Sequence, residues 1–112
     1  MSKPDQMSQS YVVSDDAVRF ATMIMAGQGV SNEDATVIAE CLVEADLRGV
    51  QTHGLSRLPV YVERVQRGLV KAVPNMKLEN PVAACASLDG DNGFGFLVGR
   101  RAMQEAITMA DS

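Results

Sequence analysis

The chain has 112 residues, of which 46% are hydrophobic and 21% are charged, and its formal net charge is −4. This composition is typical of a soluble globular protein, and the length favours one domain with a modest core. The acidic balance argues against nucleic acid as a partner, and no apolar run approaches the roughly 20 residues that a membrane-spanning helix needs. Because the first residues lack an apolar signal segment, we expect a cytoplasmic protein.

The charge is unevenly distributed along the chain. Residues 46–71 carry five basic side chains against two acidic ones, whereas both flanking segments are acidic. The only histidine, His53, lies in this basic window. A positive field around a titratable imidazole suits a small anionic ligand. The alternative is a solvated helix face, and charge alone favours that alternative.

Residues 1–10 are polar and lack periodicity, so we expect a flexible tail there. A first helix is predicted from Ser14, its N-cap, to about Gly27. A capping box that begins at Ser31 predicts the start of a second helix, and Gly49 predicts its end. The apolar spacing predicts that the two helices pack as a hairpin. The predicted buried positions are Ala17, Phe20, Ala21 and Ile24 in the first helix and Ile38, Cys41, Leu42 and Ala45 in the second.

The rest of the chain predicts a third helix from Ser56, with Pro59 in its first turn. We expect a loop over residues 70–81 with a short extended piece at 76–78, a strand over residues 82–88, and a fourth helix from Phe96 onward. The expected fold is therefore α+β, mainly helical, with about four helices and one or two short strands. The last helix stops in mid-pattern, which suggests a piece of a longer protein. Cys41 and Cys85 are predicted to be buried free thiols, with a disulfide as the less favoured alternative.

His53 is the residue that most strongly suggests chemistry. It lies in a loop beside two glycines, with Arg48 and Arg57 nearby, and such a histidine can act as a general acid on a carbonyl while an arginine holds a carboxylate. A lone loop histidine with a purely structural role is the alternative. No metal site is expected, since no second His or Cys stands at ligand spacing. The glycines at 90, 93 and 95 fit neither the dinucleotide fingerprint nor a P-loop.

The stretch ADLRGVQTHG over residues 45–54, continued by LSR over 55–57, resembles the malate/L-lactate dehydrogenase family of NAD(P)-dependent oxidoreductases. The family pattern is A-D-L-R-G-x-x-S-H-G-x-x-R, and Thr52 stands where serine is more usual. The runs SNEDA (31–35) and LDGDNGFG (88–95) also resemble the family. The resemblance covers roughly residues 12–112 in the right order.

The resemblance implies the N-terminal part of a non-Rossmann enzyme that interconverts small 2-hydroxy and 2-oxo acids with NAD or NADP and works as a homodimer. It implies that His53 is the proton donor, Arg57 the carboxylate clamp, and Thr52 a residue that orients the histidine or the substrate. Tyr61 either lines the same pocket or simply packs. Residues 11–72 would form a helical domain and residues 73–112 the start of the nucleotide-binding domain. The alternative is a small helical protein-interaction module without catalytic activity.

Overall fold

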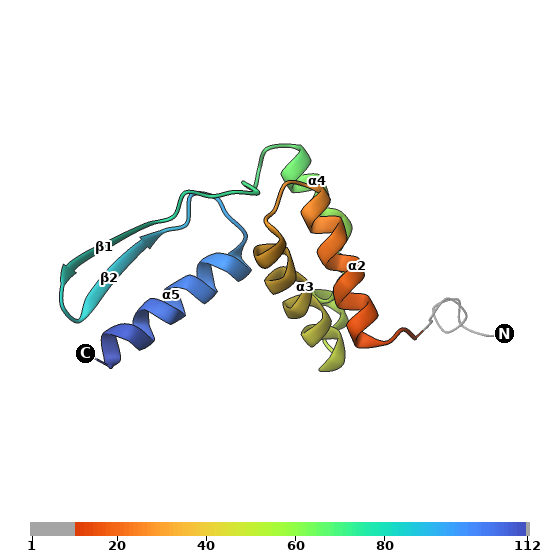
Figure 1. The fold of residues 1–112 in the computed structure, drawn as a ribbon, viewed down its shortest axis with the longest axis horizontal. Coiled ribbons are helices and arrows are strands. Elements are labelled where there is room, and N and C mark those ends of the chain that lie inside the picture. The colour runs from red at the N-terminus through yellow and green to blue at the C-terminus, as the bar shows by residue number, and fades with distance from the viewer. Residues whose placement is uncertain (1–10, 112) are drawn as a thin grey trace.

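The computed structural model describes residues 11–111; the predicted flexible tail at 1–10 lies outside them. Figure 1 shows the elements in chain order. They are helices α2 (Ser14–Gly27) and α3 (Asn32–Leu47), two 3-10 turns (Gln51–His53 and Leu55–Arg57), helix α4 (Leu58–Gln66), strands β1 (Lys77–Val82) and β2 (Cys85–Asp89), and helix α5 (Gly95–Ala110). The two strands form an antiparallel sheet. The predicted α+β class is confirmed.

Helices α2 and α3 form the predicted hairpin, and a side chain caps the start of α3 but not that of α2. The Ser31 hydroxyl accepts a hydrogen bond from the backbone N–H of Asp34 at 3.2 Å, which confirms the predicted cap of α3. The prediction that Ser14 is the N-cap of the first helix is wrong, because Ser14 is the first residue of α2 and Val13 occupies the cap position without a side-chain hydrogen bond. After the helices, Gly29 and Gly49 adopt φ of 94° and 79°, a region that favours glycine.

The core lies where α2 and α3 meet the start of α4 and the start of α5. Its central residues are Ala21, Met25, Val30, Ala35, Ile38, Ala39, Leu42, Leu58, Phe94 and Leu97. The prediction that Phe20 belongs to the buried face is wrong, since its side chain is 57% exposed. The buried stripe of α2 instead follows Ala17, Ala21 and Met25, four residues apart, so Phe20 is rotated away from the core.

Both cysteines are free, as predicted, but they are exposed rather than buried. Cys41 precedes the fully buried Leu42 on α3 and therefore lies about 100° round the helix from it. Partial burial of Cys41 nevertheless raises the pKa of its thiol above the ordinary value. Cys85 begins β2, and it pairs with Val82 across the hairpin.

The strand prediction for residues 82–88 is wrong in its bounds. Val82 ends β1, residues 83 and 84 form the turn, and β2 begins at Cys85. The apolar run from 82 to 88 is thus shared between two paired strands, so an uninterrupted β pattern conceals a tight hairpin turn. The extended piece expected at 76–78 belongs to a longer strand, Lys77–Val82.

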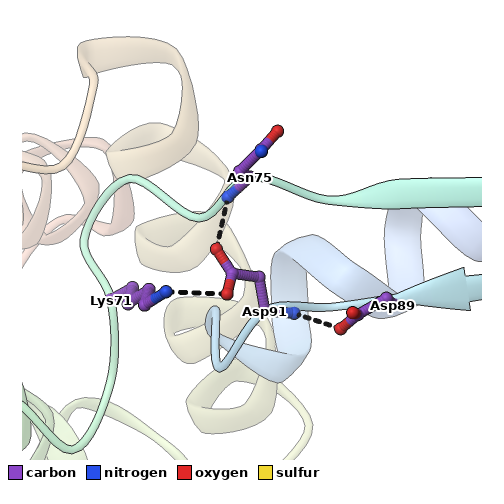
Figure 2. A network of polar contacts seen from close by, with 4 residues as sticks. All are labelled: Lys71, Asn75, Asp89 and Asp91. Carbon is purple, nitrogen blue, oxygen red and sulfur yellow. Dashed lines mark hydrogen bonds and ion pairs between the residues drawn. The ribbon is translucent and has the colours of Figure 1, made fainter.

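A network of polar contacts holds the segment that leads into β1 against the turn that leaves β2 (Figure 2). The Asp91 carboxylate accepts hydrogen bonds from Lys71 Nζ at 2.7 Å and from the Asn75 backbone N–H at 2.8 Å. The Lys71 hydrogen bond, followed by that of Asn75, holds the pKa of the Asp91 carboxyl below its ordinary value. Asp89 in turn accepts from the Asp91 backbone N–H at 2.9 Å. This turn is therefore a structural junction between the helices and the hairpin.

Candidate active site

The segment that follows α3 folds into two consecutive 3-10 turns, and these carry the predicted site residues. The Val50 N–H donates to the Ala45 carbonyl at 2.8 Å, which closes the end of α3. His53 N–H then donates to Val50 O at 3.1 Å, and Arg57 N–H donates to Gly54 O at 3.0 Å. The predicted helix start at Ser56 is wrong by two residues, because Leu55–Arg57 forms a 3-10 turn and α4 begins at Leu58. Pro59 lies in the first turn of α4, as predicted.

Thr52 contacts both of the other residues for which the sequence suggests chemistry. Its Oγ1 lies 2.9 Å from His53 Nδ1, and its backbone carbonyl accepts a hydrogen bond from Arg57 Nε at 2.9 Å. All three residues are exposed, so a small ligand could reach them from solvent. One threonine thus contacts the imidazole through its hydroxyl and the guanidinium through its backbone carbonyl.

Tyr61 lies one helical turn beyond Arg57 but makes its aromatic contacts elsewhere. Its ring packs edge-on against Phe94 at 5.8 Å and against Phe96 at 5.7 Å between centroids. Together with Arg64, these rings line a hollow of about 420 Å³ between α4 and the start of α5. The packing interpretation of Tyr61 is thus visible in the structure, whereas no contact joins Tyr61 to the Thr52–His53 pair among the contacts that the structure records for residues 11–111.

Arg48 forms an ion pair with Glu44 on its own helix, Nε to Oε1 at 2.7 Å. This agrees with a structural interpretation of Arg48. Asp46, to which the sequence assigns no role, makes a contact that helps to shape the turn. Its Oδ2 accepts the backbone N–H of Leu55 at 2.9 Å. The signal that could have revealed Asp46 is an acid in the last turn of a helix, where the helix dipole disfavours a negative charge.

The glycine-rich turn between β2 and α5 is closely packed at two of its glycines. A Cβ at Gly90 would lie 2.9 Å from Val98 Cγ2, and a Cβ at Gly93 would lie 2.7 Å from Pro74 Cγ. These two glycines make room for the chain's own side chains, not for a phosphate. Residues 11–111 contain no group of three or more metal-ligating side chains.

The sequence profile described as malate/L-lactate dehydrogenase matches residues 12–112. A malate dehydrogenase from Pyrococcus abyssi is 36% identical over 98% of this chain, which covers 31% of the relative. An L-sulfolactate dehydrogenase from Methanocaldococcus jannaschii is 40% identical over 73% of this chain and 24% of its own length. A ureidoglycolate dehydrogenase (NAD(+)) from Escherichia coli is 37% identical over the same shares of the two chains.

Solved structures agree with the sequence comparisons. A malate dehydrogenase from Pyrococcus horikoshii OT3 superposes on 92% of this chain with a TM-score of 0.84 at 36% identity, and the match covers 32% of that chain. A sulfolactate dehydrogenase from Methanocaldococcus jannaschii superposes on 88% with a TM-score of 0.85 at 33% identity, covering 29% of its length. The chain spans about a third of the length of these relatives, and over residues 12–112 it belongs to the malate/L-lactate dehydrogenase family.

Proposed function

We propose that this chain supplies the proton-transferring and carboxylate-binding part of an oxidoreductase that interconverts small 2-hydroxy and 2-oxo acids. Family membership supports an oxidoreductase over a non-catalytic helical interaction module. The similar proteins are named for malate, sulfolactate and ureidoglycolate, which all carry a carboxylate beside the reacting carbon. The chemistry of the turn suits that shared feature, since it offers one proton-carrying group and one carboxylate-binding group.

The observation that carries the proposal is the double contact of Thr52. The hydroxyl contacts His53 Nδ1 and therefore leaves Nε2 as the ring nitrogen that faces a ligand. A threonine hydroxyl both donates and accepts hydrogen bonds. Because Nε2 gains and loses its proton while Nδ1 stays protonated, the hydroxyl can accept from Nδ1–H in both states, and the ring keeps its orientation throughout.

In this proposal His53 delivers a proton to the substrate oxygen during reduction and removes it from the hydroxyl group during oxidation. Arg57 holds the neighbouring carboxylate. Its Nε is already occupied by the Thr52 carbonyl, so its two terminal nitrogens remain for a bidentate contact with the carboxylate oxygens. The substrate is thereby fixed between the two residues, and the reacting carbonyl is brought to the imidazole.

The cofactor part of the proposal rests on the family. The oxidant or reductant is NAD or NADP. We assign its binding residues to the part of the relatives' length that this chain does not span. A homodimer is proposed because large apolar side chains are exposed on the helices, among them Met23 at 73% and Leu47 at 68%. A cytoplasmic setting is proposed because both cysteines are free thiols, which a reducing compartment maintains. Among the described residues no helix is long and apolar enough to cross a membrane.

The test is a chimera in which this chain replaces the matching segment of the malate dehydrogenase from Pyrococcus abyssi. His53→Ala should lower kcat by about 10²–10⁴, as expected for the loss of a general acid, and should leave the thermal unfolding of the chain unchanged because His53 is exposed. Thr52→Ser should stay active, whereas Thr52→Val, which lacks the hydroxyl, should lower kcat. A His53→Ala chimera as active as the parent would refute the proposed role.

A further inference from the structure

The two 3-10 turns that carry His53 and Arg57 are weakly held by their own backbone. The bonds within them include His53 N–H to Val50 O at 3.1 Å and Gly54 N–H to Gln51 O at 3.3 Å. Hydrogen bonds of this i to i+3 type have poor geometry, and short 3-10 segments depend on contacts with other elements. Side chains add to this backbone: within the turns, Ser56 Oγ donates to Gln51 O at 2.8 Å and Arg57 Nε to Thr52 O at 2.9 Å, and a further contact comes from α3.

Asp46 is the side chain of α3 that reaches into this turn. Its Oδ2 accepts the N–H of Leu55 at 2.9 Å, and the bond is partly buried. Leu55 is the first residue of the second turn, directly after Gly54, where the chain passes from one 3-10 turn to the next. One carboxylate thus holds the junction between the turn that ends at His53 and the turn that ends at Arg57.

Gly54 is matched to this carboxylate. It is buried although its neighbours in the turn are not. A Cβ placed on Gly54 would collide with Asp46 Oδ1. Any larger residue at 54 would therefore occupy the space of the carboxylate. Because glycine lacks a Cβ, the backbone at this position can approach the Asp46 carboxylate closely.

The position of Asp46 on α3 makes the contact rigid and explains why the contact is needed. Leu42 and Val43, one turn earlier, are buried in the core, so the helix that carries Asp46 is fixed. The last turn of α3 contains no basic residue, and a negative charge there is opposed by the helix dipole. The Leu55 N–H offsets that repulsion by donating to the carboxylate.

We propose that Asp46 is the positioning residue of this site, which holds the Gly54–Leu55 junction so that His53 and Arg57 face the same substrate. The inference rests on the proposed function for what the two residues do, but its physical content is the orientation of the turn. Asp46 acts through the backbone and touches no reacting atom. Its role is to remove the conformational freedom that a 3-10 turn would otherwise keep.

The experiment is solution NMR on this chain, in which His53 supplies a unique imidazole signal because it is the only histidine. Asp46→Ala should shift the ring-proton signals, remove the contact between the His53 ring and the Thr52 side chain, and raise the exchange rate of the Leu55 amide by about tenfold. Asp46→Asn keeps an oxygen acceptor and should restore all three. The matched control is Glu44→Ala on the same helix, which removes only the exposed pair with Arg48 and should leave the His53 signals in place.

A second pair of variants tests the contact with Gly54. Gly54→Ala should displace the His53 signals strongly, since its methyl group collides with the Asp46 carboxylate. Adding Asp46→Ala to it should relieve the collision, so that the double variant is less perturbed than Gly54→Ala alone. Additive perturbations would overturn the inference. Should Asp46→Ala fail to fold, amide exchange in the unmodified chain decides, because Leu55 must be better protected than Ser56.

Titration of each protein with pyruvate separates this inference from the proposed function. Displaced His53 signals in Asp46→Ala, with no pyruvate binding to any protein, would support the positioning role and count against the function. Pyruvate binding to the unmodified chain, with identical His53 signals in the unmodified and Asp46→Ala proteins, would overturn the positioning role and leave the function standing.

Discussion

Replacing Arg57 with lysine separates a carboxylate clamp from an exposed charge. Lysine keeps the charge but loses the planar fork of the guanidinium. In the structure Arg57 Nε is occupied by the Thr52 carbonyl at 2.9 Å, which leaves the two terminal nitrogens for a carboxylate. A single ammonium group cannot make both sets of contacts. The change therefore removes about one charge-assisted hydrogen bond to the substrate, worth roughly 1.5–3 kcal/mol.

This free energy corresponds to a fall in kcat/KM of about 10- to 150-fold, since each 1.4 kcal/mol or so is a factor of ten. The assay is kcat/KM for a 2-oxo acid in the Pyrococcus abyssi chimera. Arg67→Lys is the matched control, because Arg67 forms an exposed ion pair with Glu63 at 3.0 Å on the same helix and such pairs contribute little. Arg64→Lys, in the same helix, should also have a small effect. Equal, small effects at all three arginines would refute the clamp and leave the basic segment a solvated face.

Three further predictions concern the fold. Ile38→Ala, at a fully buried position, should lower the free energy of unfolding in urea by about 2–5 kcal/mol. The folded state lowers the pKa of Asp91 below its ordinary 3.8. Its stabilising contribution is therefore present above pH 3.8 and is lost as the pH falls through the folded-state pKa. Acid titration should show the stabilities of Asp91→Asn and of the unmodified chain converging below pH 3.8. Because burial raises the pKa of Cys41, its thiol should react with a disulfide reagent at pH 8 or so more slowly than in the urea-unfolded chain.

Helix positions were predictable because their signals are local. The capping box at Ser31 and the glycine at 49 mark both ends of α3, and the structure places the helix between them. The errors lie where rotation about a helix axis decides burial. Phe20 and Cys41 fit an apolar spacing, yet each lies one position away from the stripe that meets the partner helix. Only the packed arrangement of α2 on α3 determines which of two neighbouring apolar stripes is covered.

The strand error has a different cause. Residues 82–88 form one continuous stretch of apolar and small residues, in which no glycine, proline or asparagine marks a turn. The hairpin turns at residues 83 and 84 because Val82 pairs with Cys85, and a register irregularity lies between Glu79 and Val82. Pairing across the sheet therefore determined the turn, and pairing is information that a single stretch of sequence does not carry.

The local geometry of the candidate site depends on contacts between residues close in sequence. The contacts that build it join residues no more than nine positions apart, from Asp46 with Leu55 to Thr52 with Arg57. A short motif can encode such a turn, so the family pattern over residues 45–57 and these contacts fall on the same segment. Tyr61 shows the opposite case, because the rings that pack against it, Phe94 and Phe96, come from the start of α5, far along the chain. Its role depends on how α5 is placed against α4, and a change at Phe94 should therefore alter Tyr61 while leaving the Thr52–His53 contact intact.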